Sequence, residues 1–114
     1  MLIGELASRT GVSERLLRYY ERCGLLESGR HANGYREYDE SVVETVAAIR
    51  ALLAAGLPTR IIRQVLPCAE GRARLRACPG VLDALRVQLG VLDRRAAELA
   101  EARTLLEKTI ATVS

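Results

Sequence analysis

The sequence of 114 residues has no tryptophan or phenylalanine, and it contains one histidine and three cysteines. A single histidine in a loop, with no Ser/His/Asp or paired-carboxylate arrangement on a pocket-forming scaffold, argues against catalysis, so we expect no enzyme and no catalytic residue. An odd, sparse set of cysteines excludes a secreted disulfide scaffold. No apolar run reaches the roughly 18 to 20 residues of a membrane-spanning helix, and the N-terminus lacks a signal-peptide pattern. We therefore expect a cytoplasmic protein with no membrane partner.

Lysine is nearly absent, because Lys108 is the only one among 17 basic residues. Arginine suits forked contacts with phosphate or guanine, although a GC-rich genome produces the same bias. The charge is uneven: residues 41–80 contain six arginines and two acids, whereas residues 1–40 contain six arginines and seven acids. A net charge of +3 permits a polyanionic partner without requiring one. Contacts made by residues 1–40 must therefore depend on where individual charges lie.

Helical spacing of apolar residues predicts two short helices at the N-terminus. The first spans residues 3–10 and ends at Gly11, and Ser13 is a good N-cap for the second, which runs from Glu14 to about Cys23. Two short helices joined by Gly-Val-Ser form a helix-turn-helix, whose second helix can enter a DNA major groove. The second helix has an apolar side, comprising Val12, Leu16, Leu17, Tyr20 and Cys23, and a charged side, comprising Glu14, Arg15, Arg18, Tyr19 and Arg22. We expect the cysteine on the apolar side to be structural.

A turn-rich segment follows the two helices. Short extended segments over residues 25–27 and 35–38 flank the turn formers of residues 28–34, and this pattern predicts a small β-hairpin. Asp39 is then a good cap for a helix over residues 40–55. The hairpin would therefore lie beside the helix-turn-helix, in the position of a wing.

After a short helix over residues 60–66, a much longer helix is predicted from Pro79, with Cys78 as its N-cap, to Thr112. Only Gly90 interrupts it, at a cost of about 1 kcal/mol. A helix of about 34 residues is about 50 Å long, more than so small a domain can cover. Its apolar seam therefore needs a partner chain, and we expect a homodimer rather than a helix folded back on its own domain. The seam comprises Leu82, Leu85, Leu89, Leu92, Ala96, Leu99, Leu106, Ile110 and Val113.

The order of the motifs is more specific than any one of them. The chain reads IGELASRTGVSERLLRYYERCGLL, then NGYREY, then AIRALLAAGLPTRIIRQVL, and ends in the long helix. Together these segments resemble the MerR family of bacterial transcription regulators over nearly the whole chain. The resemblance implies a mainly α fold, with a winged helix-turn-helix DNA-binding domain and linking helices over residues 1–77. Residues 78–114 would form a dimerisation helix in an antiparallel coiled coil.

The same resemblance implies a function and its partners. Such homodimers bind a palindromic element in an unusually long promoter spacer and, when an effector is present, distort the DNA so that RNA polymerase can use it. We therefore expect double-stranded promoter DNA and a second copy of the chain as direct partners, RNA polymerase as an indirect partner through the promoter, and no cofactor. The alternative is a helical protein–protein interaction module without DNA-binding activity. The operator, the target genes, the effector and the choice between activation and repression stay open.

Candidate DNA contacts lie on the second helix and in the hairpin. Arg15 and Arg18 lie one turn apart with Tyr19 beside them, where guanidinium groups can reach base edges or phosphates. A solvated face is the alternative, which the flanking turn and hairpin disfavour. Hairpin donors suited to phosphate are Arg30, His31, Asn33, Tyr35, Arg36 and Tyr38. By resemblance, Tyr35 and Arg36 are the wing's phosphate contacts, and Thr59 and Arg60, at a helix N-terminus, form a second wing.

Cys68 and Cys78 are candidate effector or redox residues. In metal-sensing relatives, a cysteine at the start of the dimerisation helix, as Cys78 is here, acts with further cysteines from a later loop. Because no Cys or His follows Cys78 before the sequence ends at Ser114, we expect no complete metal site of that design and no four-cysteine iron–sulfur cluster. The two thiols could form a disulfide under oxidation, hold a thiophilic ion with two ligands, or be structural. The sequence leaves these three roles open.

Overall fold

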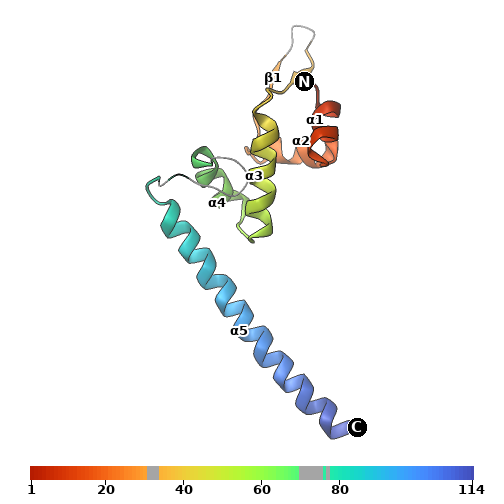
Figure 1. Ribbon diagram of the computed structural model, residues 1–114, viewed down its shortest axis with the longest axis vertical. Helices are drawn as coiled ribbons and strands as arrows, with labels where there is room; N and C mark the ends of the chain where they lie inside the picture. The colour runs from red at the N-terminus through yellow and green to blue at the C-terminus, as the bar shows by residue number, and fades with distance from the viewer. Residues whose placement is uncertain (31–33, 70–75, 77) are drawn as a thin grey trace. The chain divides into compact units, whose positions relative to one another are not determined.

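The chain divides into two compact units, Met1–Val81 and Leu82–Ser114. The computed structural model describes residues 1–30, 34–69, 76 and 78–114 (Figure 1). The first unit contains helices α1 to α4 and a two-stranded sheet, and the second consists of helix α5. Across these described ranges, no helix has both the length and the hydrophobicity that crossing a membrane requires.

The helix-turn-helix is present where the sequence predicts it. α1 spans Ile3–Thr10 and α2 spans Glu14–Arg22. The Ser13 hydroxyl oxygen accepts a hydrogen bond from the Leu16 amide at 3.1 Å. This bond satisfies one of the amides that the start of a helix leaves unpaired, so Ser13 is the N-cap that the sequence indicates.

α2 ends in a Schellman motif. Gly24 adopts the left-handed conformation at φ 77°, and the Leu25 amide donates to the Tyr20 carbonyl at 2.9 Å. Leu25 and Leu26 are then both buried, at 3% and 4% exposed. The strand predicted over residues 25–27 is therefore wrong, because a strand would place these two neighbours on opposite faces, whereas both enter the core of the unit.

The hairpin is present but shorter than predicted. β1 spans Gly29–Arg30 and β2 spans Arg36–Glu37, and the two strands pair antiparallel. In this register Gly29 lies opposite Glu37 and Arg30 lies opposite Arg36. The hairpin therefore projects from the end of the helix-turn-helix, as a wing does (Figure 1).

The linking helices follow the hairpin. α3 spans Val42–Ala54, α4 spans Thr59–Val65, and a 3₁₀ turn, η1, spans Leu66–Cys68. α3 begins two residues later than predicted, because the Asp39 carboxylate accepts bonds from the Ser41 amide at 3.0 Å and hydroxyl at 2.6 Å. These bonds close a local turn that precedes the helix instead of capping it directly.

One contiguous core holds the first unit together. α1 contacts α2 and α3, and α4 contacts α3 and η1 (Figure 1). No polar or charged residue is buried among the described positions of this chain. Each fully buried leucine or isoleucine contributes about 1.5–3 kcal/mol to folding. The largest fully buried side chains are Leu6, Leu17, Tyr38, Val46, Ile49, Ile62 and Val65.

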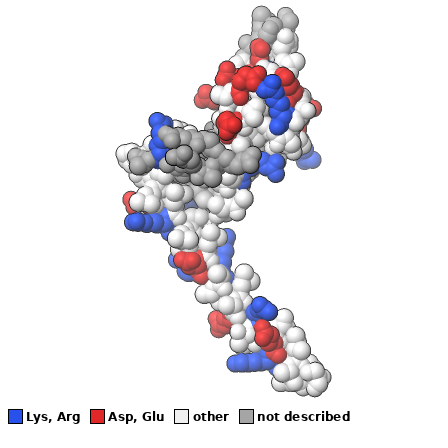
Figure 2. Space-filling model, viewed as in Figure 1, with Lys and Arg blue, Asp and Glu red and all other residues white. Residues whose placement is uncertain are grey.

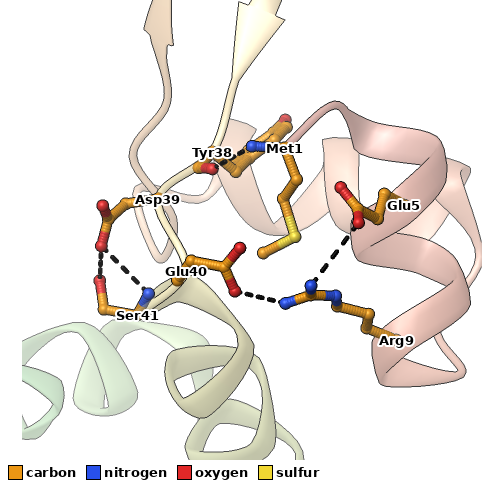
Figure 3. Close-up of polar contacts among 7 residues, drawn as sticks. All are labelled: Met1, Glu5, Arg9, Tyr38, Asp39, Glu40 and Ser41. Atoms are coloured by element: carbon orange, nitrogen blue, oxygen red, sulfur yellow. Dashed lines mark hydrogen bonds and ion pairs between the residues drawn. The ribbon is translucent and has the colours of Figure 1, made fainter.

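Polar contacts fix the N-terminus beside the base of the hairpin (Figure 3). The Met1 ammonium donates to the Tyr38 carbonyl at 2.8 Å, and the Tyr38 amide donates to the Met1 carbonyl at 2.7 Å. The Arg9 guanidinium forms ion pairs with Glu5, at 3.6 Å, and with Glu40. The start of the chain, α1 and the segment before α3 are thereby joined.

α5 spans Val81–Val113. The predicted start at Pro79, with Cys78 as the N-cap, is wrong by two residues. The Cys78 carbonyl instead accepts a hydrogen bond from the Val81 amide at 3.2 Å, in a turn where Gly80 is left-handed at φ 83°. Cys78 therefore lies in the turn that leads into the helix.

The surface of α5 carries many large apolar side chains. Val81 is the one residue of this helix that is buried. White side chains run along the visible face of the helix between scattered blue and red ones (Figure 2). The exposed apolar residues are Leu82, Val87, Leu89, Leu92, Leu99, Leu105, Leu106, Ile110 and Val113, and most are more than half exposed. A single copy of the helix therefore leaves the predicted seam uncovered.

We expect Asp39→Asn to flatten the pH dependence of unfolding in acid. Hydrogen bonds from the Ser41 side chain and amide hold the pKa of Asp39 below its ordinary value of 3.8. A depressed carboxyl pKa stabilises the fold above the unfolded value, and this contribution is lost as the pH falls through the folded value. Urea unfolding followed by circular dichroism should therefore show a steeper loss of stability below pH 3.8 in the native chain than in the variant.

Asp93→Asn, which changes an exposed acid on α5, is the matched control and should leave the native slope unchanged. Parallel curves for the native chain and Asp39→Asn would contradict the assignment of these bonds.

Candidate nucleic-acid interface

The outward side of α2 carries two large exposed side chains. Leu16 is 38% exposed and Tyr19 is 45% exposed, whereas Leu17 and Tyr20 are buried. The prediction that Leu16 faces the core is therefore wrong, because so short a helix buries only a narrow stripe, and the prediction for Tyr20 is confirmed. A hollow of about 470 Å³ on this side is lined by Ser13, Arg15, Leu16, Tyr19 and Arg22.

The arginines of α2 are held weakly or not at all. Arg18 pairs with Glu14 at 3.4 Å, and both side chains are about half exposed. The Arg22 guanidinium lies 5.9 Å from the centre of the Tyr19 ring, within cation–π range. Arg15 is exposed and makes no hydrogen bond or ion pair within the described part of the chain. The positive charge on this face is therefore available to an anion.

Cys23 lies at the edge of the same face rather than in the core. It is a free, half-buried cysteine at the C-cap of α2. A side-chain hydrogen bond with Cys23 raises the pKa of Tyr19, and the nearby Arg22 charge opposes this effect. The side chain is half-buried rather than fully buried, and its structural role stays a prediction.

Glu21 joins α2 to the hairpin through both of its carboxylate oxygens. Its Oε2 pairs with Arg36 Nε at 3.1 Å, and its Oε1 accepts a hydrogen bond from the Tyr38 hydroxyl at 3.0 Å. Tyr38 is 1% exposed, and burial, followed by the bond to Glu21, raises its pKa. The predicted role of Tyr38 as a donor to DNA is therefore wrong: its side chain lies in the core, and its hydroxyl is already used.

The role of Glu21 was not predicted from the sequence. A usable signal exists, since Glu21 follows the buried Leu17 by four residues and so lies on the same side of α2. An acid in that position needs a partner, and a basic residue on a neighbouring strand is the natural one. The structure shows that Arg36 supplies it.

The remaining hairpin candidates are only partly covered by the structure. Tyr35 is 42% exposed, and the Arg36 side chain is 44% exposed. Arg30 belongs to β1, opposite Arg36. His31 and Asn33 lie outside the described residues. Two of the predicted phosphate contacts, Tyr35 and Arg36, are therefore at the surface of the first unit.

α4 is fixed against the end of α2. Arg63 Nη1 donates to the Cys23 carbonyl at 3.2 Å, and a Cβ atom on Gly24 would approach Arg63 Cδ to 3.3 Å. In the first turn of α4, Thr59 is half-buried and Arg60 is exposed. The predicted second wing lies at the start of α4, and α4 is thus hydrogen-bonded to the end of α2, the helix that carries Arg15 and Arg18.

Cys68 and Cys78 form a disulfide, with their Cα atoms 6.3 Å apart. Cys68 is 7% exposed and Cys78 is half-buried. Three backbone and side-chain hydrogen bonds of Arg76 bracket the bond: its amide donates to Cys68, its guanidinium donates to Pro67, and its carbonyl accepts from the Cys78 amide. The part of the chain that the structure describes contains no group of three or more potential metal ligands.

Comparison with known proteins gives a consistent family. Residues 1–68 match the family model of the MerR HTH family regulatory protein. The HTH-type transcriptional regulator HmrR of Rhizobium leguminosarum bv. viciae is 34% identical over 110 residues, which cover 96% of this chain and 84% of that protein. The mercuric resistance operon regulatory protein of Bacillus cereus is 38% identical over 65 residues, which cover 56% of this chain and 49% of that protein.

Solved structures agree. The transcription regulator PbrR691 from Ralstonia metallidurans CH34, in complex with lead(II), has a TM-score of 0.75 and 29% identity, over 94% of this chain and 84% of that one. HiNmlR, a MerR family regulator lacking the sensor domain and bound to promoter DNA, has a TM-score of 0.60 and 22% identity, over 96% of this chain and 86% of that one. The second likeness concerns the fold alone.

We expect Glu21→Ala to lower the free energy of unfolding by about 1–3 kcal/mol, because it leaves the buried Tyr38 hydroxyl without an acceptor and Arg36 without a partner. Glu14→Ala is the matched control on the same helix: it removes only an exposed pair with Arg18 and should change stability by less than about 1 kcal/mol. Urea unfolding of the two variants measures both values. Equal losses would show that Glu21 is an ordinary surface acid.

Proposed function

Because this chain belongs to the MerR family of helix-turn-helix transcriptional regulators, we propose that it binds a palindromic promoter element as a homodimer and distorts the DNA to control transcription. Its relatives are transcription regulators rather than enzymes. One observation carries the proposal: the outward side of α2 exposes Arg15, Leu16 and Tyr19 beside a hairpin that Glu21 holds in place. Each chain thus presents one surface for one half-site.

α2 enters the major groove in this proposal. Arg15 has no hydrogen-bond or ion-pair partner among the described residues and is suited to the O6 and N7 acceptors of guanine. Leu16 exposes an apolar side chain next to it, which suits the methyl group of thymine. Tyr19 adds a hydroxyl at the edge of the hollow, within reach of the backbone. Sequence is therefore read by neighbouring polar and apolar contacts.

Arg18 changes partners on binding. Its pair with Glu14 is half exposed, and such surface pairs are worth only about 0–1 kcal/mol. A phosphate offers a shorter, charge-assisted contact. Arg18 therefore leaves Glu14 for the DNA backbone or a base edge at little energetic penalty.

The hairpin and the start of α4 grip the backbone on either side of α2. Tyr35 and Arg36 contact phosphates from the wing, with Arg30, His31 and Asn33 as further donors of the same hairpin. Thr59 and Arg60 form the second wing. Tyr38 has a different role from the one predicted, because from the core it positions Glu21 and hence Arg36.

Two copies of α5 pair to form the dimer. The helix leaves Leu92, Leu99, Leu106 and Ile110 exposed, at spacings of seven, seven and four residues that place them on one side of the helix. Burying a leucine contributes about 1.5–3 kcal/mol, so one seam of this length can hold two chains together. A second copy is the natural occupant, because an antiparallel pair places two identical DNA-reading units along one duplex.

The dimer works in the cytoplasm, and it affects RNA polymerase only through the shape of the promoter. Its signal is thiol-reactive, redox or metal-based, and it acts through Cys68 and Cys78. Two thiols alone do not complete the four ligands that zinc prefers, which favours thiol chemistry over a divalent metal in this segment.

We expect Arg18→Ala to weaken binding to the preferred palindrome by about 1–3 kcal/mol, and Arg36→Ala to weaken binding to all duplexes alike. The palindrome is obtained by selection from a random duplex library, and dissociation constants are measured by gel shift. We expect this difference because Arg18→Ala removes a contact to a base, whereas Arg36→Ala removes a contact to a phosphate.

Arg94→Ala is the control, because Arg94 is an exposed arginine of α5 that follows Leu92 by two residues and so lies on the side opposite the seam. It should bind like the native chain. Unchanged affinity in both Arg18→Ala and Arg36→Ala would refute the proposed orientation on DNA, and failure to select any duplex would favour a protein–protein interaction module.

We expect Leu99→Glu to convert the dimer into monomers at micromolar concentration, because it places a charge in the apolar seam. Glu101→Ala, two residues away on the side opposite the seam, should remain dimeric. Analytical ultracentrifugation distinguishes the two states. A native chain that sediments as a monomer would remove the basis for a palindromic operator.

A further inference from the structure

A covalent link joins η1 to the turn that leads into α5. Cys68 is the last residue of η1, and Cys78 lies in the turn that leads into α5. Both cysteines belong to the first unit, which ends at Val81. The disulfide therefore lies within the first unit and ties the end of η1 to the residues that precede α5.

The bond is unusual for a protein that acts on chromosomal DNA. The cytosol keeps thiols reduced, and the disulfides found there are mostly transient, catalytic or redox-sensing. The first unit does not need a disulfide cross-link to hold its fold, because it has its own apolar core. Completely buried side chains from four different helices contribute to this core: Leu6, Leu17, Ile49 and Ile62. A role beyond stabilisation therefore fits the bond best.

We propose that Cys68 and Cys78 form a reversible redox switch, which peroxide closes and cellular dithiols open, and which sets the orientation of the DNA-binding unit relative to α5. This inference rests on the proposed function. It assigns the signal to the oxidation state of this cysteine pair and makes a bound metal ion unnecessary.

The chemistry follows from the exposure of the two thiols. Cys78 is half-buried, so its thiolate is the one that can attack a peroxide oxygen; the O–O bond breaks, and a sulfenic acid and hydroxide form. The buried Cys68 thiolate then attacks the Cys78 sulfur, forming the S–S bond and releasing a second hydroxide. The two thiol protons convert both hydroxides to water, and the peroxide has gained two electrons.

Opening runs by thiol–disulfide exchange. A dithiol reductant attacks the more accessible sulfur, that of Cys78, and Cys68 leaves as a thiolate. The second thiol of the reductant then releases Cys78 and forms the reductant's own disulfide. The electrons come from the reductant, and the protein regains two thiols.

Contacts around Arg76 keep the cysteines close without the bond. The Arg76 amide donates to the Cys68 carbonyl at 2.7 Å, and its Nη2 donates to the Pro67 carbonyl at 2.9 Å. The Cys78 amide donates to the Arg76 carbonyl at 2.8 Å. These bonds do not involve sulfur, so the reduced segment can keep both thiols within reach of each other and close again.

A contiguous set of contacts leads from the switch to α2. η1 continues directly from α4, and Arg63 on α4 donates to the Cys23 carbonyl at the end of α2. The stem of Arg63 also lies against Gly24. Opening or closing the bond at Cys68 therefore acts on η1 and, through it, on α4. α4 is in turn hydrogen-bonded to the end of α2, the helix that we propose to enter the major groove.

The closed bond should strengthen binding to a palindrome and leave a single half-site unaffected. The dimer binds both half-sites at once only when each DNA-binding unit has the correct orientation relative to its own α5. The closed disulfide reduces the number of incorrect orientations. Coupling energies of this kind correspond to changes of about 5- to 150-fold in affinity. We expect at least a fivefold lower dissociation constant for the oxidised dimer.

The experiment compares native chain, Cys78→Ser and Cys23→Ser on the selected palindrome and on a duplex with one half-site. Each protein is measured after dithiothreitol treatment and after hydrogen peroxide treatment with the peroxide removed. The native chain and Cys23→Ser should show the fivefold change on the palindrome alone, and Cys78→Ser should show none. A native change below twofold, or an equal change in Cys78→Ser, would overturn the switch.

Reversibility is tested separately on the full chain. Alkylation and mass spectrometry across glutathione buffers of different reduced-to-oxidised ratio should show the Cys68–Cys78 bond half closed within the series. A bond that stays closed in the most reducing buffer is structural and overturns the inference. Loss of DNA binding in both redox states would count against the proposed function instead, so the two failures are distinguishable.

Discussion

The surface that we propose to bind DNA depends on the hydrogen bond and the ion pair of the Glu21 carboxylate. The carboxylate accepts a bond from the buried Tyr38 hydroxyl and pairs with Arg36, so it joins α2 to the second strand of the hairpin. A two-stranded hairpin alone is marginally stable in water. Its direction is set here by this contact and by the backbone bonds between Met1 and Tyr38 (Figure 3). Side-chain contacts at Glu21 therefore join α2 directly to the second strand of the hairpin and the residue that follows it.

The long helix has a different physical basis. The first unit has its own core, whereas α5 exposes most of its apolar side chains. Folding of the first unit and the proposed pairing of α5 are thus separate events, and the Cys68–Cys78 bond lies in the first unit, just before α5 begins. A regulator with this arrangement can change how its two DNA-reading units are connected without disturbing either core.

Periodicity and capping residues were enough to predict the helices. Ser13 and the apolar spacing located α1 and α2 to within a residue, and the uncovered seam of α5 was visible in its leucines. Contacts between distant segments were not visible in the sequence. The burial of Tyr38, the exposure of Leu16 and the late start of β1 all depend on tertiary packing, which overrides local pattern when an element is short.

The ion pairs inside the interface also affect how the complex responds to salt. A DNA-binding arginine normally displaces condensed cations from the duplex, and added salt opposes that release. In the proposed complex Arg18 leaves Glu14, and the freed carboxylate attracts cations from solution. The net number of ions released per phosphate contact in that complex is then smaller, so we expect its affinity to depend less on salt than its number of phosphate contacts implies.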